Sequence, residues 1–252
     1  SANKMFFECK KLESQFNYPI KKDRAGNYKV PTGMMLRVCM NSDFFFEGLD
    51  SWRDECWNMM ARRKGVLFYL LTKRPERIQS HLPKNWGDGW INVMINVTCE
   101  NQNRVNERLP ILKEIPALHK GVMVAPMLTP VSLKPWINEG WIQNVNCGGE
   151  NYGGARPCHY EWVKNLSDEC KEANVKFTFI ETGSCFYKNG QKISTGANKV
   201  LQSQYARKLG LNVKEEQHLY NPRFQPTWSE QCLHCGSQPI CMGVNPHTNK
   251  CS

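Results

Sequence analysis

The sequence lacks the features of a membrane or a secreted protein. No stretch of its 252 residues is apolar for long enough to cross a lipid bilayer. No secretory signal is recognisable, and eight of the twelve cysteines are scattered singly instead of forming a disulfide framework. We therefore expect a protein of the reducing cytoplasm that has no membrane partner.

Common catalytic signatures are lacking as well. No Ser/His/Asp arrangement and no His-x3-His pair is present, and the six histidines are dispersed, so the sequence gives hydrolase chemistry no support. The glycine-rich stretch 148–154 lacks the spacing of a phosphate-binding loop and does not indicate a nucleotide cradle. Close approach of a ligand and simple turn formation both remain open for it.

Basic residues are in excess, with a formal net charge of +10. Such a charge permits a polyanionic partner such as nucleic acid, although a solvated surface is the commoner explanation of a charge run. A modest cluster lies near the start of the chain, at Lys10, Lys11, Lys21, Lys22, Arg24 and Lys29.

Four cysteines near the end of the sequence have the spacing Cys-x2-Cys-x5-Cys-x9-Cys. The first pair allows two thiolates to bind one ion, and the other two complete a tetrahedral shell. The intervening residues are mostly turn formers, so this segment cannot build an apolar core and needs a cross-link. We predict structural zinc, with an iron–sulfur cluster, disulfides or free thiols as alternatives. The predicted metal ligands are Cys232, Cys235, Cys241 and Cys251.

Apolar and β-branched runs recur at the spacing of a strand followed by a helix. This alternation predicts an α/β fold with a parallel sheet, either a partial or complete (β/α) barrel or an open doubly wound sheet. The predicted domains are a basic segment (1–33), a barrel-like domain (34–213) and a cysteine-rich metal-binding tail (214–252). The predicted strands are 35–40, 66–71, 93–97, 122–125, 142–146 and 176–180.

Helical periodicity is clearest in the segment just before the second predicted strand. Segment 51–63 is predicted to be a helix in which Ser51 and Asp54 form a capping box. Its predicted apolar stripe consists of Trp52, Cys56, Met59 and Met60. Segments 160–173 and 198–209 are also predicted helices. Pro110 is expected to kink or split the helix that follows the third strand.

Polar residues follow each predicted strand. The carboxyl ends of parallel strands meet at one edge of a sheet, where α/β proteins bind their ligands. Lys73 and Arg74 could meet a carboxylate or a phosphate, and the glutamates could accept hydrogen bonds. Salt bridges between neighbouring strand ends explain the same residues without a ligand. The candidate binding residues are Asp43, Lys73, Arg74, Glu100, Asn101, Gly148, Gly149, Glu150 and Glu181.

Four motifs carry a resemblance: LTKRPER at 71–77, NVTCENQ at 96–102, GGEN with GARP within 148–157, and FIETG at 179–183. In this order they resemble the phage-associated three-Cys-motif family, whose members are predicted radical-SAM-like proteins of largely unknown function. The resemblance implies a radical-SAM type of barrel, S-adenosylmethionine as cofactor, and a loop of three cysteines that holds a [4Fe–4S] cluster.

The sequence departs from the family pattern at two places. The three-cysteine loop is expected upstream of residues 4–18, where only Cys9 lies nearby, so no cluster ligand is assigned. Either the loop belongs to a longer protein or the chain lacks its cluster. The segment Gly148-Gly149-Glu150 is similar to the motif that contacts the cofactor's amino group in radical-SAM enzymes, but it follows a late strand instead of an early one.

Two functions from different classes follow from these observations. The first is a radical-SAM-like enzyme, in which reductive cleavage of S-adenosylmethionine yields a radical that takes hydrogen from an unknown substrate. The alternative is a non-catalytic nucleic-acid-binding module with a zinc-stapled tail. A cluster-free partner of another protein from the same gene neighbourhood is a third possibility.

Overall fold

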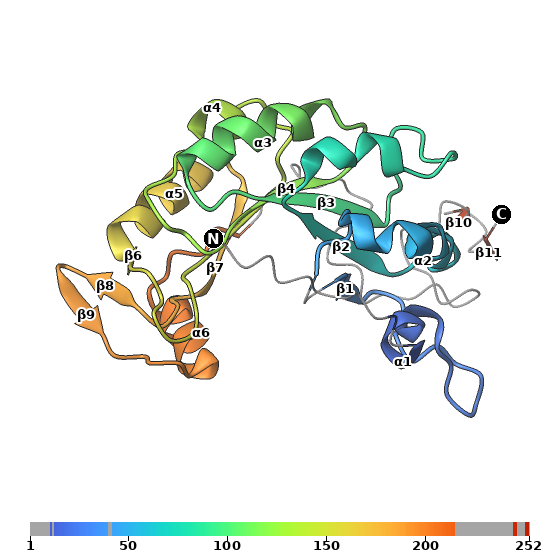
Figure 1. The fold of residues 1–252 in the computed structure, drawn as a ribbon, viewed down its shortest axis with the longest axis horizontal. Coiled ribbons are helices and arrows are strands. Elements are labelled where there is room, and N and C mark those ends of the chain that lie inside the picture. The colour runs from blue at the N-terminus through green and yellow to red at the C-terminus, as the bar shows by residue number, and fades with distance from the viewer. Residues whose placement is uncertain (1–10, 12, 40–41, 215–243, 246–249, 252) are drawn as a thin grey trace.

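The computed structural model describes residues 11, 13–39, 42–214, 244–245 and 250–251. Strands and helices alternate through most of this part of the chain, as Figure 1 shows. The strands are β1 (Met35–Arg37), β2 (Leu67–Thr72), β3 (Val93–Thr98), β4 (Lys120–Val124), β5 (Asn144–Gly148), β6 (Cys158–His159), β7 (Lys176–Glu181), β8 (Phe186–Lys188), β9 (Gln191–Ile193), β10 (Val244–Asn245) and β11 (Lys250–Cys251). The helices are α1 (Glu13–Phe16), α2 (Asp50–Arg62), α3 (Gln102–Glu114), α4 (Lys134–Ile137), α5 (Tyr160–Glu172) and α6 (Lys199–Lys208). Short 3-10 helices cover Tyr18–Ile20, Glu47–Leu49, Pro75–Arg77 and Gln79–His81.

Six strands form one parallel sheet in the order β1-β2-β3-β4-β5-β7. Because the spatial order follows the chain order, right-handed crossovers place the connecting helices on the same face. A doubly wound sheet changes direction at its centre, and this sheet does not. The sheet curves into a half-barrel, so the predicted partial parallel barrel is confirmed. Each predicted strand is found within two residues of its expected start.

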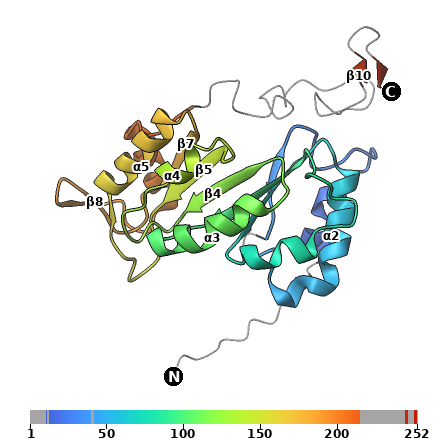
Figure 2. The same ribbon diagram turned by 90° about the horizontal axis from the view of Figure 1, so that it is seen from above.

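One face of the sheet is covered by α2, α3 and α5 and is apolar (Figure 2). Alternate strand residues such as Phe68 and Ile95 point to this face and are at most 1% exposed. Trp57 on α2 is the largest fully buried side chain and packs edge-on against Phe44, with ring centroids 4.9 Å apart. This layer is the main hydrophobic core of the protein.

Two smaller sheets complete the described strands. Strands β6, β8 and β9 form a three-stranded sheet after the fifth strand of the half-barrel, and β10 pairs with β11 in an antiparallel ladder. Of the four tail cysteines, only Cys251 lies within the described residues, in β11; Cys232, Cys235 and Cys241 lie outside them. The predicted zinc site therefore stays a prediction.

The local expectations for the helices are met only in part. Helix α3 is not split at Pro110 but continues from Gln102 to Glu114, with this proline on its exposed side. Helix α2 begins at Asp50, so Ser51 lies inside the helix and forms no cap. Of the stripe predicted on α2, Met59 and Met60 are buried, whereas Trp52 and Cys56 are only half-buried. Arg53 and Trp57 are the other buried residues of this helix.

Within the described parts of the chain, every helix is too short or too polar to cross a lipid bilayer.

Candidate functional site

The parallel pairing of the six strands brings their carboxyl ends to one edge of the half-barrel, here called the carboxyl edge. Asp43 follows β1 and joins it to the end of β2. Its Oδ1 accepts a hydrogen bond from the Thr72 hydroxyl (2.7 Å), and its Oδ2 accepts one from the Lys73 backbone N–H (2.8 Å). The Arg74 guanidinium donates to the same Oδ2 at 3.1 Å. Asp43 therefore links the tips of the first two strands.

Glu100 continues this network at the end of β3. Its two carboxylate oxygens accept hydrogen bonds from the Lys73 ammonium group and, at 2.8 Å, from the Arg108 guanidinium. Burial alone raises the pKa of Glu100, but the Lys73 hydrogen bond and the charges of Lys73 and Arg108 outweigh it and lower the pKa. The carboxylate is thus ionised and held in place at neutral pH.

Asn101 has a structural role in the described fold. Its side-chain Oδ1 accepts a hydrogen bond from the Arg104 backbone N–H at 3.0 Å and caps α3. This oxygen satisfies a helix N–H group, which leaves the Asn101 amide N–H groups as its contribution to any ligand.

Glu150 forms an ion pair with Arg156 on the other side of the carboxyl edge. Arg156 donates to it from the backbone N–H at 2.8 Å, from Nε at 2.9 Å and from the end of its guanidinium. These hydrogen bonds lower the pKa of Glu150 to about 2. The Arg156 side chain is 58% exposed, so the pair presents donors to solvent.

Gly149 is required by a close crossing of two backbones. A Cβ atom at this position would lie 2.0 Å from the Thr182 carbonyl oxygen in the loop after β7. The Gly149 N–H donates to the Glu181 carbonyl oxygen at 3.0 Å, and the Ser184 N–H donates to the Glu150 carbonyl oxygen at 2.8 Å. The glycine-rich stretch therefore locks the tips of β5 and β7 together, a reason that its spacing alone did not reveal.

Glu181 and Gly148 lie at the same crossing. The Glu181 carboxylate accepts a hydrogen bond from the Asn151 side-chain amide at 2.7 Å, and Gly148 lies at a register shift between β5 and β7. The Asn151 side-chain oxygen is buried and has no hydrogen-bond partner. The tip of β7 thus carries a carboxylate held by an amide, next to an unsatisfied acceptor.

The predicted residues form two clusters on this edge. One joins Asp43, Lys73, Arg74 and Glu100 across the first three strands, and the other joins Glu150 and Glu181 across the last two. The charge of Glu100 contributes, after Glu150, to raising the pKa of Arg156, so the clusters act on each other electrostatically. The loop after β4 lies between the two clusters. It is held there by hydrogen bonds from the Met127 N–H to the Gly148 backbone carbonyl oxygen and from the Leu128 N–H to the Glu100 backbone carbonyl oxygen.

Sequence reasoning missed the two arginines that complete these clusters, Arg108 and Arg156. Arg108 lies on α3 eight residues after its partner, and Arg156 lies within the GARP motif. No periodic signal linked Arg108 to Glu100, because Glu100 precedes the helix and lies outside its repeat. Nothing local to Arg156 marked its bidentate pairing.

The inner face of the half-barrel, opposite the helices, carries buried polar side chains. The Asn146 side-chain amide on β5 donates to the Tyr69 hydroxyl on β2 at 3.0 Å. On a flat sheet these strands would be about 14 Å apart, at roughly 4.8 Å per neighbour, too far for two upright side chains to meet. The curvature of the sheet allows the contact, and burial raises the pKa of Tyr69 to about 12.

Asn96 on β3 lies on the same inner face and is fully buried. Its amide donates to the carbonyl oxygens of Leu70 and Met94, whereas its Oδ1 has no partner. A Cβ at Gly121 on the neighbouring strand would lie 2.2 Å from that oxygen, so Asn96 occupies the space beside a glycine. An unsatisfied buried acceptor costs stability and marks a position where a ligand donor would be favourable.

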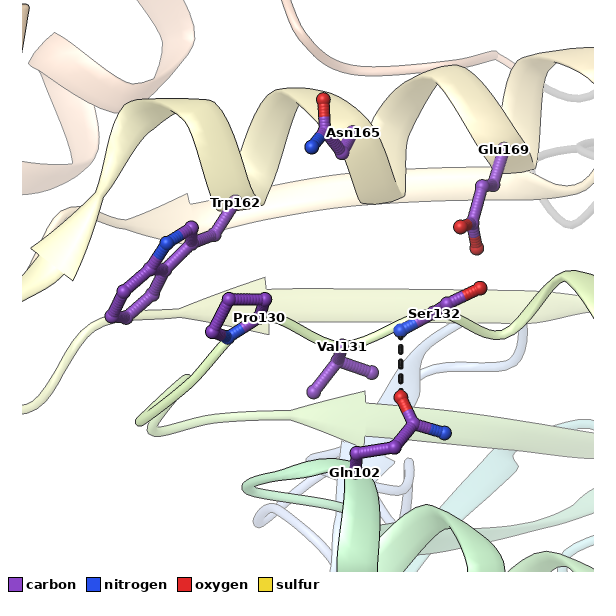
Figure 3. Close-up of a pocket in the computed structure, with 7 residues that line it drawn as sticks. All are labelled: Gln102, Pro130, Val131, Ser132, Trp162, Asn165 and Glu169. Carbon is purple, nitrogen blue, oxygen red and sulfur yellow. Dashed lines mark hydrogen bonds between the residues drawn. The ribbon is translucent and has the colours of Figure 1, made fainter.

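A surface hollow of about 250 Å³ lies on the helix side, between α3, the loop before α4 and α5 (Figure 3). Its polar side chains hold the loop: Gln102 accepts from the Ser132 N–H at 2.9 Å, and Glu169 accepts from the Leu133 N–H at 2.8 Å. These two bonds hold the loop before α4 against α3 and α5, which gives both side chains a structural role.

Four of the described cysteines are poor metal ligands. Cys99, Cys147, Cys158 and Cys170 are buried, and burial raises the pKa of each thiol, to about 12 for Cys99 and Cys158. Within the described ranges, no three His, Cys, Asp or Glu side chains are grouped so that they could hold a metal ion. This finding does not test the tail metal, because Cys232, Cys235 and Cys241 lie outside the described residues.

Residues 4–218 match the model of a family described as "Protein of unknown function (DUF5131)", and the chain belongs to this family. No curated protein matches the chain. No solved structure matches it either.

Proposed function

We propose that this member of a family of unknown function is a radical-SAM-like enzyme that binds S-adenosylmethionine at the carboxyl edge and the adjoining inner face. The four motifs that resemble the phage-associated three-Cys-motif family support the proposal. The observation that carries it is the meeting of three of these motifs, with Lys73, Glu100 and Glu150, at one edge of a half-barrel.

The chemistry of the side chains fits the polar groups of the cofactor. S-adenosylmethionine carries a carboxylate, an ammonium group, a ribose diol and an adenine ring. Lys73 and Arg156 are 52% and 58% exposed and can bind the carboxylate. Glu150 and Glu181 can accept hydrogen bonds from the ammonium and ribose groups.

The role of these residues is to hold the ligand in a site that is already ordered. The ion pairs of Asp43 and Glu100 fix the strand tips before a ligand arrives, so little ordering is required on binding. When bound beside a reduced [4Fe–4S] cluster, S-adenosylmethionine supplies one-electron chemistry that can remove hydrogen from an unreactive C–H bond. We assign no ligand of such a cluster to a residue of this sequence.

Binding of the cofactor tests the proposal without any need for turnover. Equilibrium dialysis with radiolabelled S-adenosylmethionine should show one site per chain, and Lys73→Ala should weaken binding at least about tenfold, the loss of one charge-assisted hydrogen bond. The matched control is Lys134→Ala on α4, whose side chain is 60% exposed and pairs with Glu172. Absence of binding by the wild-type protein, or equal losses in the two variants, would contradict the proposal.

We propose in addition that the tail binds structural zinc through Cys232, Cys235, Cys241 and Cys251. Metal analysis of the full chain should give one zinc ion, and Cys232→Ser or Cys235→Ser should release it and increase proteolysis of the tail alone. Iron with visible absorption would favour a cluster in the tail instead. Unchanged metal content in both variants would refute the ligand assignment.

A further inference from the structure

Residues 21–29 form an exposed hairpin, here called the basic hairpin, just before β1 (Figure 1). Its two arms are joined by hydrogen bonds from the Lys29 N–H to the Lys21 carbonyl oxygen and from the Asp23 N–H to the Asn27 carbonyl oxygen, both 2.8 Å. All nine residues are exposed. Since the hairpin leads into the start of β1, it lies at the amino edge of the sheet, away from the carboxyl edge.

Four of the nine residues of the basic hairpin are cations, and the structure describes no ion pair for any of them within its ranges. The one carboxylate, Asp23, is used by the turn. Its Oδ1 accepts hydrogen bonds from the backbone N–H groups of Ala25 and Asn27, each at 2.9 Å. The positive charge of Lys21, Lys22, Arg24 and Lys29 therefore faces solvent. This differs from the carboxyl edge, where each cation has a carboxylate partner.

The base of the basic hairpin is held rigidly. Arg63, at the end of α2, is 5% exposed and donates to the carbonyl oxygens of Pro19 (2.7 Å) and Val30 (2.5 Å), one on each side of the hairpin. Its guanidinium also lies 3.7 Å from the centre of the Tyr28 ring. A buried arginine in this position fixes the direction of the hairpin, so a partner need not order it.

The shape and charge of the basic hairpin favour duplex DNA. The major groove of B-DNA is about 12 Å wide and admits a two-stranded ribbon, with phosphates along both walls. Lys22 and Tyr28 are paired and share one face of the hairpin, so Lys21 and Lys29 project from the other. Cations on both faces match both walls. The A-form major groove of RNA is too deep and narrow for the same entry.

A membrane is a poorer match. Peripheral membrane binding relies on large apolar side chains that enter the lipid, and the tip of the hairpin consists of Arg24, Ala25, Gly26 and Asn27. We propose that the basic hairpin is a docking surface for the major groove of duplex DNA, through contacts of its lysines and arginine with phosphates. This surface lies beyond the proposed cofactor site and does not depend on it.

Fluorescence anisotropy with a labelled 30-base-pair DNA duplex, titrated with the full chain at several salt concentrations, tests the proposal. Replacing Lys21, Lys22, Arg24 and Lys29 by Ala should weaken binding at least about tenfold and reduce the slope of log K against log salt by up to about 3.6. The residues are exposed, so circular dichroism should show an unchanged fold.

The control removes the same number of charges elsewhere, by replacing Lys134, Lys164, Lys171 and Lys192 with Ala; all four are exposed and lie on α4, α5 and β9. It should keep most of the affinity and of the salt slope. Equal losses in the two variants would reduce the interaction to general charge and overturn the proposal. So would failure of the wild-type chain to bind the duplex, tighter binding to single-stranded RNA, or binding only to phosphatidylserine vesicles. Loss of S-adenosylmethionine binding has no bearing on this result, which keeps the two proposals separable.

Discussion

The two faces of the half-barrel sheet differ in the interactions that their buried residues make: apolar contacts on one face and hydrogen bonds on the other. The helix-covered face is filled by aromatic and β-branched side chains, such as Phe68 and Ile95, that need only contact area. The inner face places Met94 and Met123 among amides and a tyrosine, and the Asn96 oxygen there has no partner. The difference shows that one face supplies stability, while the other retains polar groups at a cost that a ligand could repay.

The largest effect should come from the helix-covered face. Trp57→Ala removes a fully buried side chain that packs against Phe44 and donates its indole N–H to the His81 carbonyl oxygen at 2.9 Å. We expect the free energy of unfolding to fall by about 3–5 kcal/mol. Urea denaturation followed by circular dichroism measures it. Trp52→Ala on the same helix, at a half-buried position, should cost clearly less; equal losses would mean that α2 is rotated relative to the described structure.

The next largest effect should come from the crossing of the β5 and β7 tips at the carboxyl edge. Gly149→Ala would bring a Cβ within 2.0 Å of the Thr182 carbonyl oxygen, so the backbones of both loops must move apart. The expected loss of unfolding free energy is about 1–3 kcal/mol or more, together with weaker S-adenosylmethionine binding. Gly153→Ala is the matched control in the same loop, because its Cβ would meet no atom within 4 Å. Similar melting curves for the two variants would show that the loops are not locked.

A smaller effect is expected on the inner face itself. Tyr69→Phe removes the hydroxyl that accepts a hydrogen bond from Asn146 and leaves the amide without that partner. The loss should be about 1 kcal/mol, measured by urea denaturation. Tyr152→Phe, at a side chain that is 73% exposed, should change nothing. If Tyr69→Phe is neutral as well, the contact across the half-barrel contributes nothing and the contrast between the faces is weaker than described.

The smallest effect should appear at acid pH. Hydrogen bonds from Arg156 lower the pKa of Glu150 from 4.5 to about 2, so the folded state holds this proton less tightly than the unfolded state. The pair therefore contributes stability above about pH 4.5 that is lost as the pH falls towards 2. Arg156→Gln should flatten the acid limb of a plot of urea midpoint against pH, by a small amount because the pair is partly exposed. Lys164→Gln on α5 should leave that limb unchanged. An identical acid limb in Arg156→Gln and the wild type would mean that the ion pair is not formed in solution.

Much of the sheet could be predicted because buried parallel strands are continuous apolar runs, and β2, β3 and β7 are found within a residue of the predicted bounds. Element ends were less predictable where a competing interaction decides them. Ser51 and Asp54 fit a capping box on paper, but α2 continues directly from the 3-10 helix before it, which supplies its first turn.

For the candidate site, the sequence predicted that polar residues at the strand ends share one edge, but not the pairs that they form. That Asp43, Lys73 and Glu100 share one edge follows from parallel pairing, a consequence of the alternating strand and helix pattern. Which cation meets which carboxylate did not follow, because Arg108 reaches Glu100 from a helix and Arg156 reaches Glu150 from a loop. Such pairings depend on distances in space between residues whose spacing along the chain carries no periodic signal.

By itself the amino-acid sequence determined the order of strands and helices, the apolar layer beneath the helices, and the edge at which the polar residues gather. These follow from local periodicity, since a side chain's direction on a strand or helix depends only on its position in the repeat. Tertiary structure alone decided the contact of Tyr69 with Asn146, the crossing at Gly149 and the exposure of the basic hairpin. Each of these features depends on the curvature of the sheet or on which residues are neighbours in space. The spacing of residues along the chain encodes neither the curvature nor those neighbours.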